Sequence, residues 1–460
     1  MFLCSRGYIL YPIPRMKGDG MRETLLDKDF KPMIDSFESF QREAKEPITL
    51  TIKRGEEVVF PFTMRITSNF DKSYFYVKRI LLSLLWMVGG EKILYHGSSL
   101  FYHYLEKRFQ KDEEILSSFK EMKKIYSRPI SFERVEETPK RKDKNNPFRI
   151  SFTGCRIGLD LGGSDRKAIA LKDKKILYSE EILWSPKEQS DPLYHYLGTL
   201  DSLTRAKKHL PHVDGIGIST AGIVENNELL LGALYAKVPE EKKQKEARHV
   251  FVNLMKEHFP SIPFQVQNDG DVSALGASAL YHKNKVLGLS LGTSLAGGYV
   301  KDSSLNGWIN ELSKVPIDVS KKARKHCVLG MEGAASEYLS QKGIVFLLEK
   351  NGLSLEGDLP HKLLQIQKLA EEGDPLVLKG YHDMGAYLGS AIRYFSLFYD
   401  IESVFLLGRV MSGKGGKILL ETALENLREK KIRIDIFSAS EAFKRLGQAY
   451  IAASLPDIGK

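Results

Sequence analysis

The chain has 460 residues, of which 42% are apolar, 27% charged and 10% aromatic, and this composition excludes a disordered or fibrous protein. The 68 basic and 58 acidic residues give a net charge of +10, a mild excess that only weakly favours a polyanionic ligand such as a nucleotide. Three cysteines, Cys4, Cys155 and Cys327, form no CxxC pair, and a cytoplasmic location fits them best.

The N-terminal part of the chain, residues 1–135, is predicted to be a small α+β module. From Ile48 to Ile66, apolar residues alternate on both sides of a turn at Gly55, which predicts a β-hairpin. Helical patterns follow at Tyr74 to Val88 and at Ser99 to Phe109, with a short strand between them. No apolar run in the chain reaches the roughly 18 residues of a membrane span, so no membrane partner is expected.

Residues 136–149 are predicted to be a charged linker. Their basic residues do not alternate with aromatic side chains that could stack on bases, so a solvated connector is favoured over a nucleic-acid-binding arm. The preceding module lacks the compact three-helix pattern of a DNA-binding head, and no nucleic-acid partner is expected. Docking of the module onto the rest of the chain and a role as an oligomer interface, for example in a homodimer, both stay open.

After the linker, strands alternate with helices. Three strand-like runs between Arg156 and Leu183 predict a meander, and a helical pattern follows from Leu193 to His209. The next apolar strand, Val213 to Ser219, ends in small residues. A similar order of strand, glycine turn and helix recurs from Val286 and again from Val404.

This alternation predicts an α/β fold with helices packed on mixed sheets. Two similar halves are expected, with residues 150–272 forming a first lobe and residues 273–460 a second. The sequence is also compatible with a C-terminal helix that returns to the first lobe.

Three glycine-rich turns next to strands are candidate ligand-binding loops. Gly158 to Ser164 places the carboxylate of Asp160 ahead of two glycines, so that backbone N–H groups can approach a phosphate while the acid holds a cation. Gly292 to Gly298 adds the Thr293 hydroxyl, and the glycines of Gly408 to Gly416 allow a flat ligand to lie on the backbone. Each turn alone could be structural, but the first two recur about 130 residues apart, which favours binding.

The segment Asn268-Asp269-Gly270-Asp271 follows a strand and precedes a helix. An aspartate at the mouth of a sheet can accept a proton from an alcohol, while the amide of a neighbouring asparagine holds that alcohol in place. A turn in which Asp271 caps the next helix is a strong competing interpretation.

In chain order, these motifs resemble those of the ROK (repressor, ORF, kinase) family of sugar kinases within the actin-like ATPase superfamily. The resemblance covers residues 150–453. It implies two lobes that close over ATP and a sugar, with Asp269 as general base and Mg²⁺ bridging the phosphates near Asp160. The implied phosphate and nucleotide contacts are Asp160, Gly162, Gly163, Ser164, Gly292, Thr293, Gly408, Gly415 and Gly416. The implied acceptor contacts are Ala221 and Gly222 of a sugar-side loop, Asn268, Glu311 and Lys314.

The chain departs from the family on the acceptor side. The family's Glu-x-Gly-His segment here begins with Glu311 but ends with Lys314, so the sugar-binding carboxylate is kept and the histidine is replaced. A later run keeps Cys327 alone of three cysteines and has Ser336 in place of a glutamate, so no structural zinc is expected. Lys314 could favour an acidic or phosphorylated sugar, mark a site no longer used for sugar, or be a plain surface lysine.

The leading hypothesis is an ATP- and Mg²⁺-dependent kinase that acts on a hydroxyl of a sugar or sugar-like acceptor. In this hypothesis Asn268 and Glu311 orient the acceptor and Asp269 takes its proton. The alternative is a non-catalytic protein that senses a sugar or nucleotide, or a degenerate kinase scaffold. ATP hydrolysis coupled to a conformational change is a third possibility, which explains the Asn268-Asp269 pair less well.

Overall fold

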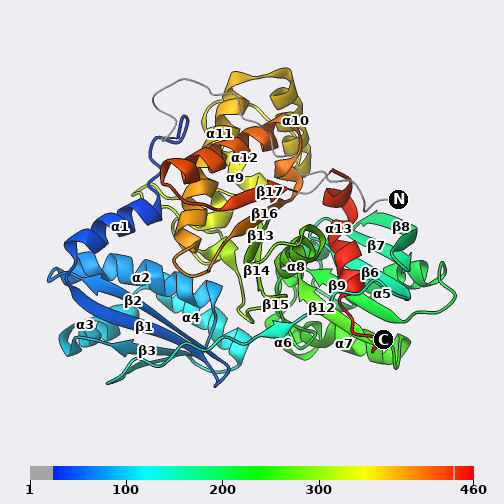
Figure 1. Ribbon diagram of the computed structural model, residues 1–460, viewed down its shortest axis with the longest axis horizontal. Helices are drawn as coiled ribbons and strands as arrows, with labels where there is room; N and C mark the ends of the chain where they lie inside the picture. Colours follow the sequence, from blue (N-terminus) through cyan, green and yellow to red (C-terminus); the bar gives the residue numbers. More distant parts are fainter. Residues whose placement is uncertain (1–23, 439–440, 460) are drawn as a thin grey trace.

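The computed structural model describes residues 24–438 and 441–459, and Figure 1 shows their arrangement. The described residues form a four-stranded, a five-stranded and a six-stranded sheet, together with a small two-stranded one. No helix among these residues has both the length and the apolar character that crossing a membrane requires.

The N-terminal module is built on the four-stranded sheet, whose strand order is β2-β1-β3-β4. The predicted hairpin and both predicted helices are confirmed, whereas helix α4 was not expected. The side chain of Asp112 caps α4 by accepting hydrogen bonds from the N–H groups of Glu114 and Ile115. The strands are β1 Glu46–Arg54, β2 Val58–Ile66, β3 Lys92–His96 and β4 Ser131–Arg134. The helices are α1 Met33–Glu43, α2 Phe70–Met87, α3 Ser99–Phe109 and α4 Glu113–Tyr126.

The five-stranded sheet has the order β12-β9-β6-β7-β8, and it contains the predicted meander. Strands β6, β9 and β12 are parallel to one another, β7 is antiparallel to β6, and β8 is antiparallel to β7. The strands are β6 Cys155–Leu161, β7 Asp165–Lys172, β8 Lys175–Leu183, β9 Gly215–Thr220 and β12 Phe264–Asn268. The elements around it are α5 Pro192–Lys207, β10 Ile223–Glu225, β11 Glu228–Leu231, α6 Glu240–Lys245 and α7 Val250–His258.

The six-stranded sheet repeats this topology in the order β17-β16-β13-β14-β15-β5. Here β13, β16 and β17 are parallel and β14 is antiparallel to β13, so the two halves of the α/β region are indeed similar. The strands are β5 Asn146–Pro147, β13 Val286–Leu291, β14 Leu295–Lys301, β15 Ser304–Leu305, β16 Ser403–Leu407 and β17 Asp435–Ser438. The helices are α8 Asp269–Tyr281, α9 Gln341–Lys350, α10 Leu359–Glu372, α11 Pro375–Phe395 and α12 Gly413–Glu429.

Two connections bind the parts together. The charged stretch expected to be a solvated linker ends as strand β5, which pairs with β15 at the edge of the six-stranded sheet. Helix α13, Glu441–Ser454, crosses from the second half of the chain onto the five-stranded sheet (Figure 1). There it lies so close that a Cβ atom at Gly217 would come 1.7 Å from the carbonyl oxygen of Ala452, which explains the glycine.

The module and the second half of the α/β region share one continuous hydrophobic core, which contains Trp86 and Ile309 together with the buried face of α11. A separate core lies under the five-stranded sheet. The module is therefore packed onto the second lobe rather than carried on a tether.

Candidate active site

The segment Asn268-Asp269 joins strand β12 to helix α8. Asn268 caps the helix, because its Oδ1 accepts a hydrogen bond of 2.8 Å from the N–H of Gly270. Its Nδ2 donates to the carbonyl oxygen of Gly222 at 2.7 Å. The competing interpretation, in which Asp271 caps the helix, is wrong: Asp271 lies in the first turn and accepts a hydrogen bond from Asn310 Nδ2 at 3.1 Å.

Asp269 is a partly buried carboxylate in a negative environment. Burial, together with the charges of Asp160 and Glu311, raises its pKa to about 8. These three carboxylates come from the start of α8, the end of β6 and the loop before the short 3₁₀ helix Leu312–Lys314. The fold thus gathers acids that are far apart in the sequence.

Asp160 is buried near the end of β6, where it faces Lys167 on the antiparallel strand β7. Burial raises the pKa of Asp160, although the Lys167 ammonium, 3.6 Å away, opposes this shift. Lys167 also contacts Asp165 at 2.6 Å. Asp160 and Asp269 both have raised pKa values, and both offer carboxylate oxygens. Such oxygens suit a hard divalent cation.

A pocket of about 140 Å³ brings many of the expected nucleotide-side residues together. It is smaller than the roughly 300–1,000 Å³ of typical ligand pockets, so its size suits a phosphate tail rather than a whole nucleotide. Gln341 also faces it, and its N–H donates to the carbonyl oxygen of Gly292 at 2.8 Å. The expected site residues that line this pocket are Asp160, Gly162, Ser164, Asp269, Gly292, Thr293 and Gly408.

Two residues that the sequence did not single out lie against the first glycine-rich turn, Gly158 to Ser164. The Nε1 of Trp184 donates to the carbonyl oxygen of Gly162 at 2.8 Å, and its backbone N–H donates to that of Ser164 at 3.1 Å. A Cβ atom at Gly163 would lie 2.9 Å from the Nζ of Lys187, so this ammonium sits against the loop. The one available signal was the Trp-Ser-Pro-Lys turn between β8 and α5.

Lys187 is a half-buried cation for which the described residues provide no carboxylate partner. Burial lowers the pKa of its ammonium, and no neighbouring charge acts against this effect. Lys167 and Arg409, in contrast, are both paired with Asp165. A desolvated cation beside backbone N–H groups favours an anion at this position.

The third glycine-rich turn begins with Gly408, which has a φ of +100°. A Cβ atom there would lie 2.3 Å from the carbonyl oxygen of Leu291, so both the backbone conformation and the packing require glycine. Gly415 and Gly416 do not line the 140 Å³ pocket. A Cβ at these positions would instead meet the ring of Tyr381 and the carbonyl oxygen of Met411, at 2.2 and 2.1 Å. Close helix packing explains these two glycines.

On the expected acceptor side, Lys314 and Glu311 bind each other. Lys314 Nζ lies 2.8 Å from Glu311 Oε2, and each side chain is only 15% exposed. The interpretation of Lys314 as a plain surface lysine is therefore wrong. Of the sugar-side loop, Gly222 has a φ of +121° and receives the Asn268 hydrogen bond, whereas Ala221 packs against the first-lobe core.

A cavity of about 840 Å³ lies elsewhere. Asn268 and Ile223 line it together with Arg54 and Tyr126 of the module. Adjacent residues thus face different spaces, because Asn268 lines this cavity while Asp269 lines the 140 Å³ pocket. The catalytic pair expected from the sequence stands between the two.

Loop 325–332, where the family's zinc motif would lie, is closed by its own hydrogen bonds. The N–H of His326 donates to the carbonyl oxygen of Met331 at 2.8 Å, and its Nδ1 accepts from the N–H groups of Val328 and Leu329. Cys327 is exposed. Among the described residues, the cluster with metal-ligand spacing is Cys155, His212 and Asp214, at the opposite end of β6 from Asp160. The absence of a structural zinc stays a prediction.

The paired sheets, with the carboxylates gathered between them, define an actin-like ATPase fold. A profile of the ROK family matches residues 156–442, and the chain belongs to the ROK family. A comparison with curated proteins finds no match.

Solved structures resemble about two thirds of the chain. A ROK family glucokinase from Streptomyces griseus, in complex with glucose and AMPPNP, has a TM-score of 0.53 and 19% identity, covering 66% of this chain and 99% of that one. A ROK hexokinase from Thermus thermophilus has a TM-score of 0.50 and 18% identity, covering 65% and 97%. A ROK family transcriptional regulator, a homologue of the E. coli MLC protein, has a TM-score of 0.50 and 19% identity, covering 65% and 78%. At such identities the likeness establishes the fold.

Proposed function

We propose that this protein is a cytoplasmic ATP- and Mg²⁺-dependent kinase that transfers the γ-phosphoryl group to a hydroxyl of a sugar or sugar-like acceptor. The observation that carries the proposal is the position of Asp269. Its carboxylate is partly buried, lies near Asp160, and lines the pocket that both phosphate-loop candidates also line. A carboxylate with a raised pKa at the head of a helix suits the role of a general base.

In this mechanism the acceptor hydroxyl lies next to Asp269, which removes its proton as the phosphoryl group arrives. Asn268 is fixed by its hydrogen bonds to Gly222 and Gly270, so the neighbouring carboxylate is held in one place. Since phosphoryl transfer requires little covalent chemistry from the protein, positioning and electrostatics supply most of the rate.

The nucleotide side offers two kinds of phosphate contact. The turns at Gly162 and Gly292 line the pocket, and Lys187 places beside the first turn an ammonium that is unpaired among the described residues. Asp160 would hold Mg²⁺, which when bound neutralises negative charge on the phosphates. A cation there would also relieve the repulsion between Asp160 and Asp269, lowering the pKa of the general base.

The proposal is tested by measuring ADP release from Mg-ATP across neutral, amino, acidic and phosphorylated sugars. The wild type is compared with Asp269→Asn. Turnover that depends on one acceptor class and disappears in the variant supports the kinase and identifies its substrate class. Bound nucleotide without any acceptor dependence would reject it.

A second candidate, a non-catalytic sensor or a degenerate kinase scaffold, is favoured by one observation. Glu311, which would orient the acceptor, is bound by Lys314 at 2.8 Å and by Ser313 Oγ at 3.2 Å. A sugar would have to compete with these partners. Direct binding of sugars without turnover would support this alternative.

A further inference from the structure

The loop that carries Glu311 is attached to the end of a helix from the N-terminal module. The backbone N–H groups of residues 309–311 donate to the carbonyl oxygens of residues 88, 87 and 86, with N···O distances of 3.3, 3.0 and 2.8 Å. The last carbonyl groups of a helix have no partner within that helix. The loop supplies these partners at the C-terminal end of α2.

Trp86, in the last turn of α2, lies directly against Lys314. The Lys314 Nζ is 4.3 Å from the centre of the indole ring, and Trp86 is fully buried. Trp86 Nε1 donates to Ser118 Oγ on α4 at 3.2 Å, which fixes the ring. A cation is attracted both to an indole face and to the negative end of a helix dipole. The module therefore stabilises the cation that pairs with Glu311.

The same module also holds the chain beyond Lys314. Arg79 of α2 is buried and donates to the carbonyl oxygen of Glu332 at 2.7 Å. The N–H of Glu332 donates to Glu114 of α4 at 2.7 Å. These contacts hold loop 325–332 against α2 and α4.

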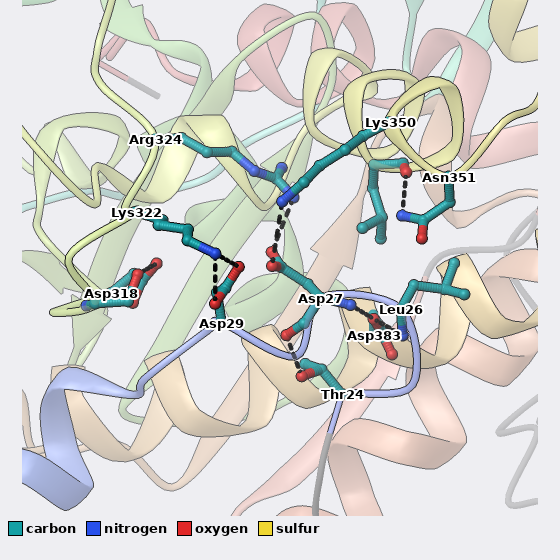
Figure 2. A network of polar contacts seen from close by, with 12 residues as sticks. Thr24, Leu26, Asp27, Asp29, Asp318, Lys322, Arg324, Lys350, Asn351 and Asp383 are labelled. Atoms are coloured by element: carbon teal, nitrogen blue, oxygen red, sulfur yellow. Dashed lines mark hydrogen bonds and ion pairs between the residues drawn. The ribbon is translucent and has the colours of Figure 1, made fainter.

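The segment that precedes α1 adds a second attachment. The N–H of Val319 donates to the carbonyl oxygen of Lys31 at 2.9 Å. Figure 2 shows the neighbouring contacts, in which the Asp27 carboxylate lies 3.2 Å from Arg324 Nη2. The N–H groups of residues 25–27 converge on the buried carboxylate of Asp383 in α11.

We infer that the N-terminal module is a fixed component of the acceptor side, and that Trp86 is a positioning residue for the Lys314–Glu311 pair. The assignment of this loop to an acceptor rests on the proposed function. Apart from those to Asp383, the contacts of the module described above fall on residues 309–332, whereas the residues lining the 140 Å³ pocket all come from the α/β region. Replacing Trp86 by a smaller side chain should consequently destabilise the acceptor loop and leave nucleotide binding intact.

The first test is hydrogen exchange of the backbone amides of residues 309–311 in the full-length protein. Trp86→Leu should speed this exchange about tenfold or more, because the partners of these amides at the end of α2 lose their packing. Trp184→Leu, the same substitution beside the phosphate loop, should leave these amides unchanged. Unchanged exchange in folded Trp86→Leu would overturn the inference.

The second test separates acceptor from nucleotide. Trp86→Leu should raise the KM for the acceptor about two- to thirty-fold, the range of a cation–π contact, with the Kd for ATP unchanged. Equal losses in both constants would overturn the inference, since they indicate a general loss of structure. Trp86→Phe and Lys314→Met keep the core filled if Trp86→Leu fails to fold, and both should show the same separation. If no acceptor supports turnover, the proposed function fails, while hydrogen exchange still decides the role of Trp86.

Discussion

Asn268 Nδ2 donates a 2.7 Å hydrogen bond to the carbonyl oxygen of Gly222, which ties the start of helix α8 to the loop after strand β9. Gly222 can occupy this place because its φ is +121° and a Cβ would lie 2.4 Å from the carbonyl oxygen of Leu231. Asp269 follows directly in the chain. The position of the proposed general base is thus set by neighbours that do not change charge.

Asp269→Asn is expected to lower acceptor-dependent ADP release by about 10²–10⁴-fold, because an amide cannot take the proton of the hydroxyl. Nucleotide affinity should persist, since the phosphate loops are untouched. A coupled ADP assay and calorimetric titration with ATP measure the two effects. Asp271→Asn, in the same helical turn but facing Asn310, serves as the matched control and should keep turnover within about tenfold. Equal losses in both variants would contradict the assignment.

The pKa of Asp269 also predicts a pH dependence of stability. In the unfolded chain an aspartate has a pKa near 3.9, whereas burial raises that of Asp269 to about 8. Between these values the unfolded state releases a proton that the folded state keeps, so this group's contribution to folding stability is lost as the pH rises toward 8. Asp269→Asn removes the effect.

The Tm of Asp269→Asn minus that of the wild type should therefore grow from pH 5 to pH 8 by at least about 2 °C. Thermal unfolding without nucleotide or metal at several pH values measures it. Asp302→Asn, the same change at an exposed site, is the matched control. A constant difference for Asp269→Asn would show that its carboxyl group titrates normally.

Lys187→Met is expected to weaken ATP binding about ten- to hundred-fold, the value of a charge-assisted contact with phosphate. Adenosine, which has no phosphate, should bind equally well to both proteins. Lys208→Met, the same substitution at an exposed position near the end of α5, is the control and should bind ATP normally. If the Lys187 variant loses adenosine and ATP affinity together, the residue supports the fold rather than the phosphates.

Gly408→Ala should destabilise the protein by about 1–3 kcal/mol and reduce nucleotide binding, because the turn lines the phosphate pocket. Gly352→Ala tests the backbone strain alone, since Gly352 has a similar φ of +95° and open space around its Cα. Denaturant unfolding of both variants isolates the cost of the contact with Leu291. Equal destabilisation of the two variants would mean that the neighbours of Gly408 shift to admit the Cβ atom, so that the contact with Leu291 costs nothing.

The sequence predicted the strands, the glycine turns and the Asn268-Asp269 pair because these depend on local spacing. Hydrophobic alternation defines a strand, and a glycine at its end permits a turn that other residues avoid. The same local patterns could not distinguish a ligand contact from close packing. Gly408 lines the pocket, whereas Gly415 accommodates the ring of Tyr381, and only their neighbours in space differ.

Tertiary structure alone decided which residues meet. Lys187 is an ordinary lysine in the sequence, and it becomes a cation without a partner among the described residues because the chain after β8 places it against the glycine-rich turn at Gly163. The sequence likewise left residues 1–135 without a role, until packing placed Trp86 of α2 against Lys314. Short-range patterns follow from backbone geometry, which each segment carries by itself. Contacts between distant segments follow from burial of a shared core, and that core exists only when the whole chain has folded.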